Sequence, residues 1–182
     1  MLEENDRLTH LIDSLLFLTH VDVKQYAVSI EKTDIPSFIL NVIDIMMPLA
    51  EDKQQRIFFH PEQDISIMSD PVLLRQALIN LLDNAIKYSP DHSEIKVKAY
   101  VMENTLYIDV SDQGPGIPET YREKIFERFY RLEKSHARTK GGSGLGLSIA
   151  RQAIEILGGK IKVYNNEEGG STFTLLFNYI KS

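Results

Sequence analysis

At 182 residues the chain is long enough to bury one sizeable core but too short for two full domains. Its hydrophobic share of 43% and charged share of 25% exclude a disordered chain, and its net charge of −6 excludes a globally basic surface for nucleic acid or anionic lipid. The absence of cysteine excludes a disulfide framework, a cysteine-ligated zinc ion and a thiol nucleophile. No apolar stretch approaches the roughly 20 residues that span a bilayer, and the acidic start differs from a signal peptide, so we expect a soluble, cytoplasmic protein.

An N-terminal helix is predicted over residues 8–19, which read LTHLIDSLLFLT. Leu8, Leu11, Leu15 and Leu18 are spaced three, four and three residues apart, as in the seam of a helical bundle or coiled coil. One helix cannot bury such a seam alone. The helix therefore either lies on the globular core or forms half of a helical hairpin.

Capping and breaking residues delimit the other predicted helices. Asp34 and Pro36 begin a helix that runs to about residue 53, and Pro48 is expected to kink it or end it early. Asp70 caps a helix over residues 71–88, and Gly158 stops a helix over residues 144–157. A short helix is expected near residues 119–126.

Short β-like runs predict strands at residues 56–59, 65–68, 95–101, 106–110, 160–164 and 172–177. The last four alternate between apolar and polar residues, as in a sheet with one covered face. The predicted fold is an α/β (α+β) two-layer sandwich, with helices on one face of a mixed sheet and a helical extension at the N-terminus.

The helix over residues 71–88 carries a second, polar face beside its apolar stripe. Asn80, Asn84 and Lys87 fall at i, i+4 and i+7, although asparagine is a mediocre helix former. A carboxamide oxygen is a hard, neutral ligand that suits Mg²⁺ bound to substrate phosphates. Taken alone, this face is better explained as an ordinary solvated one.

Two glycine-containing segments follow. In the segment DQGPG, Asp112 ends a strand and is followed by Gly114 and Gly116, which leave room for a flat ring with an exocyclic amine. Taken alone, the segment is an ordinary turn. The loop at residues 141–146 feeds a helix N-terminus, which is an anion site. It matches neither GxxxxGK[ST] nor GxGxxG, which excludes the commonest phosphate-binding loops.

Between these segments, basic side chains outnumber acidic ones by four over residues 122–140. Such a local excess would attract a polyphosphate, although a solvated charged loop has the same composition. The weakly patterned stretch at residues 133–143 is typical of a lid.

Five segments occur in the order found in one protein family: NLLDNAIKYS at 80–89, DQGPG at 112–116, FERFY at 126–130, GSGLGL at 142–147 and GSTF at 170–173. They resemble the N box, first glycine box, F box, second glycine box and final glycine motif of the sensor histidine kinase catalytic domain. Each motif alone is modest, whereas five in register are specific. The resemblance covers nearly the whole chain and implies the Bergerat ATP-binding fold, with ATP and Mg²⁺ as cofactors.

The resemblance also implies roles for individual residues. In this family the second asparagine of the N box, here Asn84, carries Mg²⁺, and Asn80 faces the same phosphates. Asp112 takes the adenine amine and Arg131 reaches the terminal phosphate. Asn84, Arg131 and Lys87 are the implied catalytic residues. The other implied nucleotide contacts are Tyr88, Gly114, Gly116, Gly142, Gly144, Leu145, Gly146, Leu147 and, near the base, Thr172.

Residues 1–24 resemble the second helix of the family's dimerisation and phosphotransfer hairpin, and residues 25–182 resemble its catalytic domain. None of the histidines precedes an acidic residue and a nearby proline, as the phosphoacceptor does: His10, His20, His60, His92 and His136. The resemblance therefore implies an acceptor on a hairpin outside this sequence, within a longer membrane-anchored sensor. It also implies a homodimer and a response-regulator receiver domain as partner, with no nucleic acid and with membrane contact only through segments not in this chain.

Three alternative functions use the same fold or the same motifs. ATP-hydrolysing machines of this fold carry a glutamate one helical turn before the Mg²⁺-binding asparagine, because water must be deprotonated as it attacks. Here that position is Asn80, which argues against hydrolysis. The bundle-type helix argues against an anti-sigma serine kinase, and the intact nucleotide motifs argue against a scaffold without activity.

Overall fold

The computed structural model describes residues 26–61, 64–132 and 143–179. Its main sheet has five strands in the order β2-β4-β5-β7-β6. The strands are β2 (Arg56–Phe59), β4 (Glu94–Met102), β5 (Thr105–Ser111), β6 (Lys160–Asn165) and β7 (Ser171–Asn178). β2 runs parallel to β4, whereas the other pairs are antiparallel, so the sheet is mixed as predicted.

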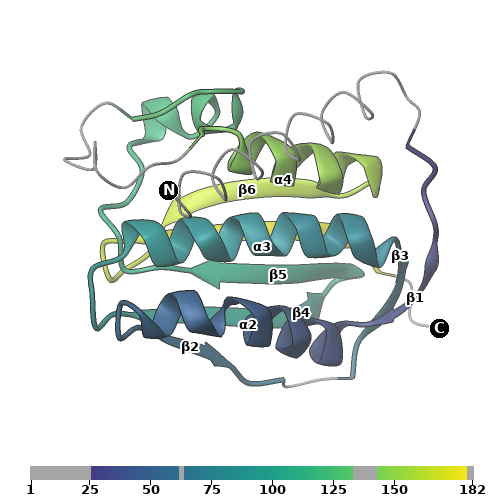
Figure 1. The fold of residues 1–182 in the computed structure, drawn as a ribbon. Helices are drawn as coiled ribbons and strands as arrows, with labels where there is room; N and C mark the ends of the chain where they lie inside the picture. Colours follow the sequence, from purple (N-terminus) through teal and green to yellow (C-terminus); the bar gives the residue numbers. More distant parts are fainter. Residues whose placement is uncertain (1–25, 62–63, 133–142, 180–182) are drawn as a thin grey trace, which may run out of the picture.

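Three helices cover one face of this sheet: α2 (Ile35–Glu51), α3 (Pro71–Tyr88) and α4 (Gly146–Ile156). Figure 1 shows α3 in the middle of this layer, over β5, with α2 and α4 on its two sides. The predicted two-layer α/β fold is confirmed. Within the described ranges, no helix has the length and apolar character needed to cross a membrane. The helical extension expected over residues 1–24 lies outside the described residues.

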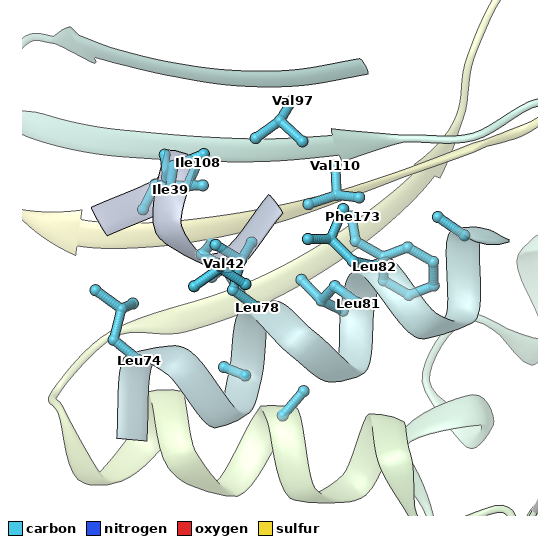
Figure 2. Close-up of a cluster of buried hydrophobic side chains, with 14 of the residues drawn as sticks. Ile39, Val42, Leu74, Leu78, Leu81, Leu82, Val97, Ile108, Val110 and Phe173 are labelled. Carbon is cyan, nitrogen blue, oxygen red and sulfur yellow. The ribbon is translucent and has the colours of Figure 1, made fainter. Parts of the chain in front are cut away.

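The core lies between α3 and the covered face of the sheet (Figure 2). Leu81 and Leu82 of α3 are fully buried, and Ile108, Val110 and Phe173 face them from β5 and β7. Truncating a leucine in such a core costs about 2–5 kcal/mol, so this packing fixes the rotation of α3 about its axis. The polar face of the same helix is thereby held at the edge of the core.

The structure differs from the sequence predictions in four places. β1 (Glu31–Asp34) was not predicted, and it forms a separate two-stranded sheet with β3 (Ser66–Ser69). Residues 119–126 hold two short 3-10 helices, η1 (Glu119–Tyr121) and η2 (Lys124–Phe126), in place of one helix.

The remaining two differences concern helix boundaries. α4 begins at Gly146, two residues later than expected, because Gly144 has a positive φ of 71° that is incompatible with the helix. Pro48 does not end α2, which continues to Glu51. The proline removes the one hydrogen bond that its own N–H would donate, and the Pro48 carbonyl oxygen still accepts from the Asp52 N–H (3.2 Å).

Candidate functional site

Both ends of α3, which carries the asparagine face, are fixed by polar side chains. At its start the buried Asp70 carboxylate accepts hydrogen bonds from the backbone N–H groups of Val72 (2.9 Å) and Leu73 (3.2 Å). At its end the Lys53 ammonium donates to the carbonyl oxygens of Ile86 and Ser89, at 2.6 Å each. A cation at a helix C-terminus also interacts favourably with the helix dipole. The polar face of α3 is therefore held rigidly.

Gln55 supports the same end of α3. Its side-chain N–H groups donate to the carbonyl oxygens of Ile86 (3.1 Å) and Pro90 (2.9 Å). The side-chain oxygen of Gln55, Oε1, is buried and has no hydrogen-bond partner among the described residues. The turn after α2 therefore determines where α3 ends and where the next loop begins.

The two N-box asparagines lie one turn apart on α3, and both are half-buried. The Asn80 amide donates to the carbonyl oxygen of Gln76 (2.7 Å), and its own Oδ1 lies 2.8 Å from the position a Cβ would take at Gly146. The first turn of α4 approaches Asn80 this closely only because residue 146 is a glycine. Within the described ranges the Asn84 side chain makes no hydrogen bond, so its oxygen is available to a hard cation such as Mg²⁺.

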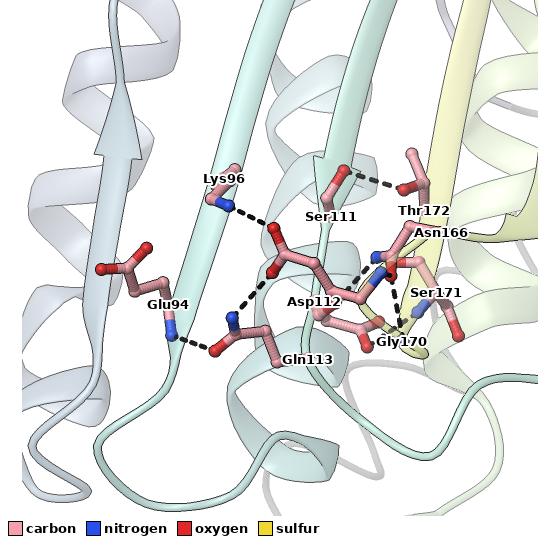
Figure 3. Close-up of polar contacts among 10 residues, drawn as sticks. Glu94, Lys96, Ser111, Asp112, Gln113, Asn166, Gly170, Ser171 and Thr172 are labelled. Carbon is pink, nitrogen blue, oxygen red and sulfur yellow. Dashed lines mark hydrogen bonds and ion pairs between the residues drawn. The ribbon is translucent and has the colours of Figure 1, made fainter.

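Asp112 follows β5 directly and is held from several sides (Figure 3). Its Oδ1 accepts hydrogen bonds from the backbone N–H groups of Gly114 (2.7 Å) and Ser171 (3.0 Å). Its backbone carbonyl accepts from the Asn166 side chain at 2.9 Å. Oδ2 accepts no hydrogen bond from the described residues, so one carboxylate oxygen is oriented but not satisfied.

The charge state of Asp112 reflects this environment. Its side chain is almost fully buried, and burial raises the pKa of the carboxyl, against the opposing effect of the hydrogen bonds from Ser171 and Gly114. A ligand that donates a hydrogen bond to Oδ2 would favour the charged form. The carboxylate is therefore prepared for a donor such as an exocyclic amine.

Glycines allow the backbone around Asp112 to pack closely. A Cβ on Gly114 would lie 3.0 Å from Asp112 Oδ1 and 3.2 Å from the carbonyl oxygen of Tyr88, so the loop contacts the end of α3. A Cβ on Gly170 would lie 2.0 Å from the carbonyl oxygen of Asp112, which excludes every larger residue there. Gly116 has a positive φ of 68°, in the left-handed region that favours glycine.

The structure distinguishes Ser171 from Thr172. The Ser171 N–H bonds to Asp112, whereas the Thr172 hydroxyl shares a 2.8 Å hydrogen bond with the Ser111 hydroxyl. Because Phe173 faces the core, strand alternation places Thr172 on the other face of the sheet, away from α3. The sequence motifs did not identify Ser171 and Asn166 as site residues. The alternation of side chains around the apolar Phe173 could have predicted that Thr172 faces away from the core.

The F box and the second glycine box are joined through the backbone. The Phe129 N–H donates to the carbonyl oxygen of Gly144 (2.9 Å), and a Cβ on Gly144 would lie 2.9 Å from the Phe129 backbone. Leu145 is buried and accepts hydrogen bonds from Ile149 N–H (2.9 Å) and the Ser148 hydroxyl (2.7 Å), which anchors the start of α4. Leu147 is half-buried against the core.

The remaining expected residues are brought together only in part. Lys87 and Tyr88 are half-buried at the end of α3, near the Asp112 loop. Arg131 is exposed, and it makes no hydrogen bond or ion pair with another residue of the described ranges. Gly142 and the expected lid lie outside the described residues.

The sequence of this chain is similar to those of known proteins. Residues 69–180 match the family model described as histidine kinase-, DNA gyrase B-, and HSP90-like ATPase. The sensor histidine kinase WalK of Bacillus subtilis is 36% identical over 178 residues, which cover 97% of this chain and 29% of the relative. The signal transduction histidine-protein kinase ArlS of Staphylococcus aureus is 36% identical over 176 residues, which cover 97% of this chain and 39% of the relative. This chain thus spans about a third of the length of these relatives.

Solved structures show the same fold. Full-length ShkA in complex with AMPPNP superposes with a TM-score of 0.86 at 25% identity, over 99% of this chain and 37% of that one. The catalytic domain of histidine kinase ThkA superposes with a TM-score of 0.73 at 30% identity, over 82% of this chain and 95% of that one. ThkA in complex with the response regulator protein TrrA gives a TM-score of 0.77 at 26% identity, over 98% of this chain and 49% of that one.

Proposed function

Because this chain belongs to the family of histidine kinase-, DNA gyrase B- and HSP90-like ATPases, we propose that it binds Mg-ATP and transfers the γ-phosphoryl group to a histidine of a dimerisation hairpin. From that histidine the phosphoryl group passes to an aspartate of a response-regulator receiver domain. The acceptor histidine belongs to a segment outside this chain. The names of the relatives, WalK and ArlS, support the histidine kinase branch of the family.

The observation that carries this proposal is the pair of amides on α3. Asn80 stands one turn before Asn84, and its oxygen faces the start of α4. A hydrolase of this fold needs a group that accepts a proton from the attacking water, and an amide cannot do so. A histidine acceptor needs no such base, because a neutral imidazole is already a nucleophile near pH 7.

The adenine end of ATP is assigned to Asp112. The free Oδ2 would accept a hydrogen bond from the exocyclic amine of adenine, while Oδ1 stays bonded to Gly114 and Ser171. Gly114 leaves the loop without a side chain where the flat base approaches. Ser171 is a better candidate than Thr172 for a position beside the base, since the Thr172 hydroxyl is bonded to Ser111.

The phosphate end is assigned to the asparagine face of α3 and the start of α4. Asn84 would hold Mg²⁺, with Asn80 nearby, and Mg²⁺ when bound neutralises charge on the phosphates. Lys87 and Arg131 add positive charge, and Gly144 and Gly146 leave the N–H groups at the start of α4 accessible to a phosphate. Phosphoryl transfer asks the protein mainly for such positioning and charge neutralisation.

The parent protein is proposed to be a homodimeric sensor whose catalytic portion is cytoplasmic. The structure of ThkA bound to the response regulator TrrA supports a receiver domain as partner. The membrane is reached only through segments outside this chain.

The test is transfer in trans. The chain is mixed with labelled ATP, Mg²⁺ and a hairpin that carries the acceptor histidine, and acid-labile phosphate on the hairpin is measured. Asn84→Ala should abolish transfer while the melting temperature stays close to that of the parent. Asn41→Ala, at an exposed position of α2, is the matched control and should transfer normally. Unchanged Mg²⁺-dependent transfer by Asn84→Ala would remove Asn84 from the site.

A further inference from the structure

We propose that Gln113, Glu168 and Lys96 form a chain of positioning residues that holds the Asp112 loop in its adenine-binding conformation. These residues lie on the side of the sheet away from the helices and do not contact the predicted nucleotide. The inference deepens the proposed function and rests on it. It adds two residues outside the sequence motifs, Glu168 and Lys96, to the determinants of nucleotide affinity.

Gln113, the residue after Asp112, connects three elements. Its backbone N–H donates to the Ser89 hydroxyl (3.3 Å) at the end of α3. Its side-chain oxygen accepts from the backbone N–H of Glu94 (2.9 Å) at the start of β4. Its side-chain amide donates to the Glu168 carboxylate (2.7 Å) in the turn between β6 and β7 (Figure 3). Both polar groups of the side chain are therefore used to hold the loop.

Glu168 is in turn held by Lys96 of β4, whose ammonium lies 2.5 Å from the second carboxylate oxygen. The pKa of Glu168 is lowered by the hydrogen bond from Lys96 and then by that from Gln113. Glu168 is thus charged at neutral pH, and its hydrogen bond with Gln113 is charge-assisted. Such bonds are about twice as strong as neutral ones.

The same turn also reaches Asp112 directly. The Asn166 side-chain amide donates to the carbonyl oxygen of Asp112 (2.9 Å), and its oxygen accepts from the N–H groups of Glu168 (3.1 Å) and Gly170 (3.0 Å). A displacement of Glu168 would therefore act on Asp112 along two routes, through Gln113 and through Asn166. The orientation of Oδ2 depends on this turn as well as on β5.

The contacts among Gln113, Glu168 and Lys96 should affect recognition of the base and leave recognition of the phosphates unchanged. Gln113 and Asp112 belong to the loop that meets adenine, whereas Asn84 is on α3 and α4 begins at Gly146, beside Asn80. A variant that only destabilised the fold would weaken both. Comparing ATP with inorganic tripolyphosphate, which has no base, separates these two effects.

The experiment measures the affinity of the full chain for Mg-ATP by calorimetry, and for tripolyphosphate by competition. Gln113→Leu should weaken ATP about tenfold, because it removes both side-chain hydrogen bonds that hold the loop, the one to Glu168 and the one from the Glu94 N–H. Lys96→Met should weaken ATP about twofold, because its ion pair is partly exposed. Glu168→Ala should weaken ATP in the parent but have little further effect in Gln113→Leu, because the carboxylate acts through Gln113, whereas the route through Asn166 uses the Glu168 backbone N–H, which the substitution keeps. Tripolyphosphate should bind all variants equally.

Lys98→Met is the matched control, since Lys98 lies two residues along the same strand and is exposed. It should bind ATP as the parent does. Glu168→Gln, which keeps an oxygen to accept from Gln113, should lose only about twofold and serves if Glu168→Ala melts early. The inference is overturned if Gln113→Leu binds ATP as tightly as the parent, or loses ATP and tripolyphosphate to the same extent. A parent that binds no ATP would instead refute the proposed function.

Discussion

Replacement of Asp112 by asparagine separates the effect of the carboxylate on ATP affinity from its effect on the stability of the fold. Asparagine keeps an oxygen at the Oδ1 position, where it accepts from the N–H groups of Gly114 and Ser171. It replaces Oδ2 with an NH₂ group, which cannot accept from the adenine amine. A hydrogen bond to a charged group contributes about 1.5–3 kcal/mol, so ATP affinity should fall about 10-fold to 150-fold.

The stability of the free protein should change in the opposite direction. Burial raises the pKa of Asp112 in the folded state, so the folded chain holds this proton at a higher pH than the unfolded chain does. Stability is therefore lost as the pH rises from the ordinary carboxyl value of 3.8 through the raised value. Asparagine carries no charge and avoids this loss. At pH 7 Asp112→Asn should melt at or above the melting temperature of the parent. The difference in melting temperature should disappear below the ordinary carboxyl pKa of 3.8.

Asp112→Ala is the informative contrast. It leaves the N–H groups of Gly114 and Ser171 without their acceptor, which costs about 1–3 kcal/mol for the buried Ser171 group and less for the half-buried Gly114 group. Calorimetry with Mg-ATP and thermal melts without nucleotide, both at pH 7, measure the two effects. The reasoning is refuted if Asp112→Asn binds ATP as tightly as the parent, or if it melts as low as Asp112→Ala.

Three further predictions test the elements around the site. Asp70→Ala should lower the free energy of unfolding by about 1–2 kcal/mol in a urea titration, because it removes a buried helix cap. Asp34→Ala, at the exposed cap of α2, should lower it less. Equal losses in the two variants would contradict the assignment of Asp70 as the stronger cap. Gly170→Ala should lose ATP binding, since its Cβ would lie 2.0 Å from a backbone carbonyl oxygen; an unchanged dissociation constant would contradict this. Gly146→Ala should reduce the rate of phosphotransfer with little change in melting temperature, since its Cβ would displace only the flexible end of Asn80, and an unchanged rate would argue against a role for that amide.

The parts of the fold that could be predicted are those with local signals. α3 was predicted with the bounds it has, Pro71–Tyr88, because Asp70 and Pro71 fix its start and the apolar stripe runs to its end. β1 could not be predicted in the same way. Its four residues, EKTD, contain one buried position, and it is a strand only because it pairs with β3.

The site shows the same division. Asn80, Asn84 and Asp112 were recognised because each stands in a local motif. The partners of Asp112 were not, because Ser171 and Asn166 are 59 and 54 residues away in the sequence. Gln113 bonds to Glu168 across 55 residues, and no local pattern marks such a pair. The supporting contacts of the site are thus products of the sheet topology.

The most direct test of the central claim compares two fates of the γ-phosphoryl group. The purified chain is incubated with labelled ATP and Mg²⁺, with and without the histidine-bearing hairpin, and free phosphate and acid-labile protein phosphate are followed together. With amides at Asn80 and Asn84, we expect acid-labile phosphate on the hairpin and little free phosphate without it. Rapid release of free phosphate that is independent of the hairpin would contradict the account.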